Sequence, residues 1–102
     1  MSEFNLNDVN VIECDEEASD DNYAISIQRA INSGMWSLQG SYGRAMMQAI
    51  EDGQAMLGPN SARDYWGNFI PSRSQVQAGT KGSREFVVEA MGEDWALMLE
   101  AA

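Results

Sequence analysis

Residues 77–84 read QAGTKGSR and hold the strongest candidate in this chain for an anion-binding loop. Two glycines can take backbone angles that point successive N–H groups at one place, and a serine after them can cap a helix. The first N–H groups of that helix would face a bound phosphate, and nearby cations would add charge. The residues expected in this site are Gly79, Lys81, Gly82, Ser83 and Arg84, with Arg73 as a third cation. The sequence favours the plainer interpretation, a connector with an ordinary N-cap, because the Walker spacing is absent.

A second group of residues could stack on a nucleobase. Tyr65, Trp66 and Phe69 lie close together in the chain, between Arg63 and Arg73. Single-stranded nucleic acids are bound in this way, by aromatic rings that stack on bases and cations that hold phosphates. The alternative, which we favour, is that the three rings form the core of a short hairpin.

Catalytic and metal-binding chemistry has little support in the composition. The chain contains no histidine, the usual general base near neutral pH and the commonest transition-metal ligand. Cys14 is the single cysteine, so it can form neither an intramolecular disulfide nor a metal site with a second thiol. Carboxylates could do acid–base work only if they converged in a pocket, and their spacing indicates no convergence. We therefore expect a non-enzymatic protein without a cofactor or metal.

The net charge of −10 is unevenly distributed along the chain. Residues 1–22 contain eight acidic and no basic residues, residues 63–84 contain four basic and one acidic, and residues 85–102 contain five acidic and no basic. A field of this sign repels phosphates at long range, so direct binding of nucleic acid is not expected. The acidic surface either serves solubility, which we favour, or imitates a nucleic acid and occupies the basic groove of another protein.

The length of 102 residues fits one domain. The predicted fold is mainly α, of the small α+β kind: a three-helix core with a short β-hairpin and, as an option, an N-terminal strand. Residues 1–18 are expected to form an acidic arm or a weak strand, and residues 19–102 the helical domain. No apolar run is long enough to span a bilayer and no signal-like start is present, so we expect a soluble protein of the cytoplasm with no membrane partner.

Apolar residues at helical spacing predict helices over residues 21–33, 41–57 and 83–100, packed around Trp36 and Trp95. Gly53 falls on the buried face of the second helix, where a glycine indicates either a close helix crossing or a break that ends the helix near Asp52. Residues 65–66 and 69–70 are predicted to pair as strands around a two-residue turn.

The stretches RAINSGMWSLQGSYGRAMMQAIEDGQAMLG, DYWGNFIPSR and GTKGSREFVVEAMGEDWA resemble a family of small proteins encoded by tailed phages of actinobacteria. The similarity covers about residues 23–97 and leaves the acidic N-terminus as the variable part. The resemblance implies an accessory protein of the phage and supplies no catalytic residues. We expect it to bind and modulate a host protein. The alternatives are a binder of a nucleotide or other phosphorylated ligand at residues 79–84, and a minor structural protein of the virion.

Overall fold

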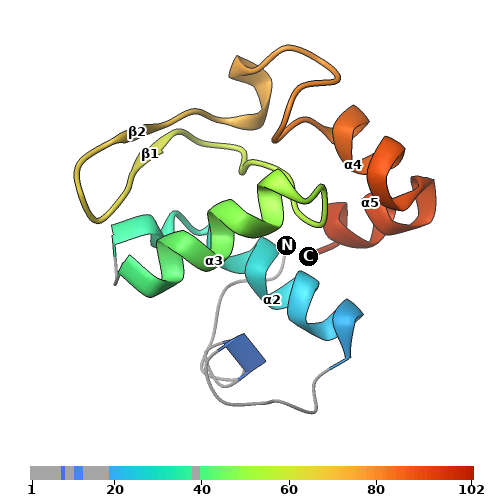
Figure 1. Cartoon of the computed structure of the whole chain (residues 1–102), viewed down its shortest axis with the longest axis horizontal. Coiled ribbons are helices and arrows are strands. Elements are labelled where there is room, and N and C mark those ends of the chain that lie inside the picture. The colour runs from blue at the N-terminus through green and yellow to red at the C-terminus, as the bar shows by residue number, and fades with distance from the viewer. Residues whose placement is uncertain (1–7, 9–10, 13–18, 38–39) are drawn as a thin grey trace.

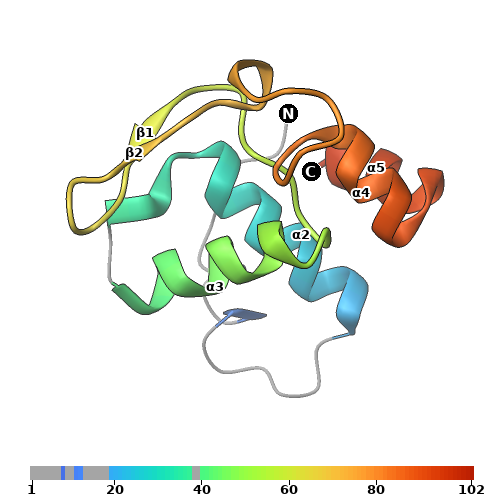
Figure 2. The same cartoon turned by 45° about the horizontal axis from the view of Figure 1, so that its top comes forward.

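The computed structural model describes residues 8, 11–12, 19–37 and 40–102 (Figure 1). In chain order the elements are α2 (Asp20–Asn32), the 3-10 helix η1 (Met35–Ser37), α3 (Gly40–Glu51), β1 (Ala62–Arg63), β2 (Phe69–Ile70), the 3-10 helix η2 (Arg73–Gln75), α4 (Arg84–Met91) and α5 (Glu93–Glu100). The prediction of a mainly α fold with a small antiparallel hairpin is confirmed. Figures 1 and 2 place α4 and α5 at the far end of the molecule from the turn of the hairpin.

α2 begins and ends at the signals that its sequence carries. The Ser19 hydroxyl accepts a hydrogen bond from the backbone N–H of Asn22 at 3.1 Å, which satisfies one of the free donors of the first turn. At the other end Gly34 has a φ of 72°, the left-handed conformation that commonly ends a helix. The helix therefore lies within one residue of the predicted range.

α3 ends at Glu51. Of the two possibilities that the sequence left open at Gly53, a break in the helix and a close helix crossing, the structure contains both. Gly53 has a φ of 77°, so the helix breaks there. The glycine is also a point of close approach, because a Cβ atom on it would lie 2.4 Å from the Cβ of Ala90 in α4. The chain beyond it, residues 53–58, passes through the middle of the molecule and is called the central segment below.

The predicted C-terminal helix is two helices rather than one. α4 stops at Met91, and Gly92 has a φ of 97°, which is outside the helical region. α5 begins at the next residue and packs back on α4 (Figure 1). The single helix predicted over residues 83–100 is therefore wrong, because a glycine in this conformation reverses the direction of the chain.

The hairpin differs from its prediction in the position of its turn. β1 and β2 are antiparallel, with opposite residues paired as Ala62 with Ile70 and Arg63 with Phe69. Tyr65 and Trp66, which were predicted to be in a strand, lie in a five-residue turn, residues 64–68. Asp64 causes this, because its Oδ1 accepts hydrogen bonds from the backbone N–H groups of Trp66 at 3.0 Å and Asn68 at 2.8 Å. An aspartate side chain that bonds the backbone two residues on stabilises a turn and not a strand.

Two clusters of buried side chains make up the core of the described residues. The first fills the space between α2, η1 and α3 and includes Ile27, Ile31, Trp36, Met46 and Ile50. The second joins α2 to α4 and α5 and consists of Ala24, Met56, Val87, Ala96 and Leu99. Trp36 is buried as predicted, whereas Trp95 packs at the edge of the second cluster and donates its indole N–H to the carbonyl of Gln54 at 3.0 Å.

A buried amide connects α2 to the central segment. The side chain of Gln28 donates to the carbonyl oxygen of Met56 at 2.9 Å and accepts from the N–H of Met56, also at 2.9 Å. Its amide nitrogen additionally donates to the Oδ1 of Asn32. Gln28 is fully buried, so this pair of bonds replaces the water that Met56 loses on folding.

The predicted acidic arm or weak strand is described only at Asp8, Val11 and Ile12, all of which have helical backbone and so are not in a strand. Asp8 is fully buried, not solvated, and its Oδ1 accepts from the Ser26 hydroxyl at 2.8 Å and from Arg29 Nη1 at 3.0 Å. The ion pair compensates for the loss of hydration of the carboxylate. The other residues of the predicted range 1–18 lie outside the described residues.

Candidate functional site

The 77–84 loop has the backbone conformation that an anion cradle requires, since Gly79 and Gly82 have φ values of 88° and 93°. Three of its N–H groups are nevertheless bonded within the loop. The N–H of Gly79 donates to the Ser83 hydroxyl at 3.0 Å, and the N–H groups of Thr80 and Ser83 donate to carbonyls of the same loop. These three donors are therefore not available to an external anion.

Ser83 has the predicted role as the N-cap of α4. Its hydroxyl accepts from the N–H of Phe86 at 3.1 Å. Gly82 has a packing role, because its carbonyl accepts from the N–H of Leu57 at 3.0 Å and a Cβ on it would lie 2.6 Å from the Leu57 side chain. The two glycines thus turn the chain and bring it against the central segment.

The side chain of Arg84 is bonded to two residues of α5. Its Nε donates to Glu100 at 2.8 Å, and its two Nη atoms donate to the carboxylate oxygens of Glu93. These bonds, to Glu93 first and then Glu100, raise the pKa of Arg84 above its ordinary value. One guanidinium therefore joins the start of α4 to both ends of α5, which we call the Arg84 clamp.

The Arg84 clamp predicts a difference in acid stability. Hydrogen bonding to Arg84 holds the pKa of Glu93 below its ordinary value of 4.5. The ionised Glu93 therefore stabilises the folded protein at pH values above its ordinary pKa. This stabilisation is lost as the pH falls through the lower pKa of the folded state. Between pH 5 and pH 3, the melting temperature of the wild-type protein should therefore fall more than that of Glu93→Gln, which has no carboxylate at this position to protonate. The difference should be only a few degrees, because Glu93 is exposed and its ion pair is screened by solvent. Parallel acid curves would show that the clamp has no part in stability.

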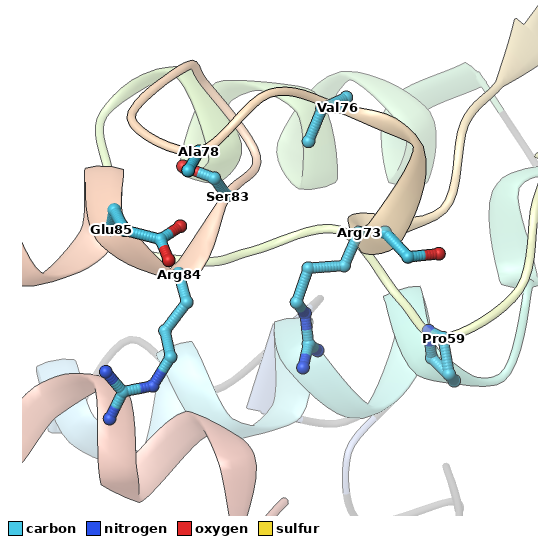
Figure 3. A pocket seen from close by; sticks show the side chains of 8 residues that line it. Pro59, Arg73, Val76, Ala78, Ser83, Arg84 and Glu85 are labelled. Atoms are coloured by element: carbon cyan, nitrogen blue, oxygen red, sulfur yellow. The ribbon is translucent and has the colours of Figure 1, made fainter.

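The cations predicted for the loop site are divided between two pockets. Lys81 is exposed and lines a pocket beside the hairpin. Arg73 and Arg84 line a different one, together with Ser83 (Figure 3). The structure therefore brings together Arg73, Ser83 and Arg84 and leaves Lys81 apart from them.

The pocket with the two arginines, called the Arg73 pocket below, has a volume of about 440 Å³. It lies between η2 and the start of α4, and its lining residues are Pro59, Arg73, Ser74, Val76, Ala78, Ser83, Arg84 and Glu85. The Nε of Arg73 donates to the carbonyl of Leu57 at 2.8 Å. Burial lowers the pKa of Arg73 by more than the nearby charge of Glu100 raises it.

Tyr65, Trp66 and Phe69 lie on the surface, and the prediction that they form the core of the hairpin is wrong. Their exposed fractions are 59%, 57% and 54%. The rings of Tyr65 and Trp66 meet edge to face, with centroids 5.5 Å apart and an interplanar angle of 79°. We call these three side chains the aromatic tip.

The turn that carries the aromatic tip is held by its own polar side chains. Besides the bonds of Asp64 described above, Arg63 Nη1 donates to the carbonyl of Gly67 at 2.9 Å. Trp66 also lies near α3, since a Cβ on Gly43 would be 3.9 Å from its ring. The aromatic tip is therefore presented on a preorganised turn, which lowers the entropy cost of binding.

A pocket of about 200 Å³ lies beside the aromatic tip, and we call it the apolar pocket. Its lining residues are Met47, Ile50, Glu51, Leu57, Phe69, Ile70, Pro71, Val76 and Lys81. Phe69 belongs both to this lining and to the aromatic tip, so the pocket adjoins the aromatic tip at this residue.

Comparison of the chain with protein-family models, curated proteins and solved structures found no match. Among the described residues, no helix is both long and apolar enough to cross a membrane. The same residues contain no group of three or more His, Cys, Asp or Glu side chains placed to hold a metal ion.

Sequence reasoning named Tyr65 and Trp66 as site candidates but missed the apolar pocket beside them. The signal for the exposure of the rings was Asp64, whose side chain favours a turn at the residues that follow it. Nothing in the sequence indicated that Met47 of α3 and Val76 would line one pocket, because the two residues are far apart in the chain.

Proposed function

We propose that this protein is a non-enzymatic binding protein whose aromatic tip docks on a partner protein. The exposure of Tyr65 and Trp66 on a preorganised turn, with Phe69 exposed at the start of β2, carries this proposal. Aromatic side chains of this kind supply most of the binding energy at protein interfaces. Three of them exposed together are unusual on a surface that serves solubility alone.

The resemblance to phage proteins suggests the partner, a protein of the bacterial host that the phage modulates. A nucleic-acid partner would suit the aromatic rings and Arg63, but the net charge of −10 opposes its approach. The lack of histidine in the chain supports a role in binding rather than catalysis.

Removal of the tryptophan should weaken partner binding by about 30-fold or more, the effect of losing about 2 kcal/mol at an interface hot spot. Wild-type protein, Trp66→Ala and Leu97→Ala would be used to capture proteins from a lysate of an actinobacterial host. The Kd would then be measured with the purified partner. Leu97 of α5 is the matched control, because it is 53% exposed and lies at the other end of the molecule (Figure 1).

All three proteins should have similar melting temperatures, since exposed side chains contribute little to folding. Equal capture by wild-type protein and Trp66→Ala would contradict the proposal. Capture that disappears after nuclease treatment of the lysate would instead assign the aromatic tip to nucleic acid.

A further inference from the structure

Arg73 is a half-buried cation with unused hydrogen-bonding capacity. Its backbone N–H donates to the carbonyl of Gly58 at 2.8 Å and its Nε to that of Leu57 at 2.8 Å, so both the backbone and the side chain are anchored to the central segment. Within the part of the chain that the structure describes, its two Nη atoms have no hydrogen-bond partner. Figure 3 shows the guanidinium extending into the Arg73 pocket.

The electrostatic balance of Arg73 favours an anionic ligand. Desolvation lowers its pKa by more than Glu100 raises it, so the protein does not fully compensate for burying this charge. Arg84 also lines the pocket, but its charge is paired with the carboxylates of Glu93 and Glu100, to which its three nitrogen atoms donate. Arg73 is therefore the cation available to a ligand, and the clamped Arg84 is a wall of the pocket.

The free edge of Arg73 fits a carboxylate. With Nε occupied, the two Nη atoms present parallel N–H donors, the geometry that binds two oxygens of one anion. The hydroxyl of Ser74 lies 3.1 Å from that of Ser72, and either can donate to the other. When Ser72 donates, the proton of Ser74 is free to reach a ligand oxygen.

The other lining residues restrict which charge and which apolar group a ligand can have. Pro59, Val76 and Ala78 offer apolar surface, which suits a compact apolar group. Glu85 also lines the pocket, and its carboxylate repels a second negative charge. The pocket therefore selects a single negative charge over the multiple charges of a nucleotide.

From these contacts we infer that the Arg73 pocket binds small monocarboxylates, with the carboxylate on Arg73 and an apolar body against Pro59, Val76 and Ala78. Such a group occurs both in free organic acids and at the C-terminus of a peptide. The site is separate from the aromatic tip and does not depend on the proposed docking function.

The test uses the full-length protein and NMR of its methyl groups and arginine Nε–H groups. The probes are benzoate for a free acid, N-acetyl-leucine for a peptide C-terminus, and benzamide as the uncharged isostere of benzoate. Ligands of this size should bind with a Kd of about 1 mM, shifting the signals of Ala78 and Arg73 saturably. Benzamide should produce no such shift. The probe with the lower Kd identifies the source of the carboxylate.

Arg73→Lys retains the charge but lacks the two parallel donors, and should weaken benzoate binding by about tenfold. Arg63→Lys is the control, because Arg63 is exposed in the hairpin. This variant should bind benzoate with the same Kd as the wild-type protein. If Arg73→Lys does not fold, Ala78→Phe serves in its place, since a phenyl ring at this lining position fills the pocket and should abolish binding.

Three results would each overturn the inference. One is the absence of a saturable shift with both acids, and another is equal binding of benzamide and benzoate. The third is tighter binding of phenyl phosphate than of benzoate, which would assign the pocket to phosphorylated ligands. None of these affects partner capture by the aromatic tip, so the two proposals fail independently.

Discussion

Replacing Gln28 by leucine is expected to lower the free energy of unfolding by about 2 to 6 kcal/mol. Gln28 is fully buried, and it pairs with both backbone groups of Met56 at 2.9 Å. Leucine has a similar volume but no polar atoms, so both groups of Met56 would stay buried without a partner. Each such group costs about 1 to 3 kcal/mol.

Gln48→Leu is the matched control. Gln48 is an exposed residue of α3 whose amide donates to Asp52 at 3.0 Å, so the same substitution there removes a hydrogen bond that water can replace. Its expected cost is below about 0.5 kcal/mol. Both variants would be unfolded in urea and followed by far-UV circular dichroism. Similar midpoints for Gln28→Leu and the wild type would mean that the central segment rearranges and recovers its hydrogen bonds.

Replacing Gly53 by alanine should destabilise the protein by about 2 to 5 kcal/mol, the sum of two effects. The φ of 77° places the residue in the left-handed region, which costs an alanine about 1 to 2 kcal/mol. The added Cβ would also lie 2.4 Å from the Cβ of Ala90, so α4 must move away. Overpacking of this kind typically costs about 1 to 3 kcal/mol.

Two further variants separate the effects. Gly34 has a similar φ of 72° but no atom within 4 Å of an added Cβ, so Gly34→Ala should show only the backbone cost. Ala90→Gly removes the atom that the new side chain meets. The double variant Gly53→Ala, Ala90→Gly should therefore be more stable than the two single costs predict when added together. Strict additivity in urea denaturation would contradict the close approach of Gly53 and α4.

Local signals in the sequence were enough for the helical part of the fold. The cap of α2 at Ser19, the end of the same helix before Gly34 and the cap of α4 at Ser83 involve partners within four positions in the chain. Interactions over so short a distance depend little on the rest of the molecule. The break at Gly53 was one of two possibilities that the sequence left open, and the break at Gly92 was not predicted, because residues 83–100 were read as one helix.

The sites, by contrast, depend on contacts that no local pattern encodes. Arg84 pairs with Glu93 and Glu100, nine and 16 positions away, and this removed a cation from the predicted anion loop. Gln28 reaches 28 positions along the chain to Met56. Partners at such separations are brought together only by packing of the helices.

The sequence by itself determined the mainly helical class, the cap at Ser83 and the uneven charge, because each follows from neighbouring residues or from composition. The tertiary structure alone decided which side chains are available to a ligand. It exposed Tyr65 and Trp66 on a turn, tied Arg84 to α5 and left the Nη edge of Arg73 in a pocket. Availability depends on what surrounds a side chain, and for Arg73 and Arg84 those surroundings come from residues that are distant in the chain.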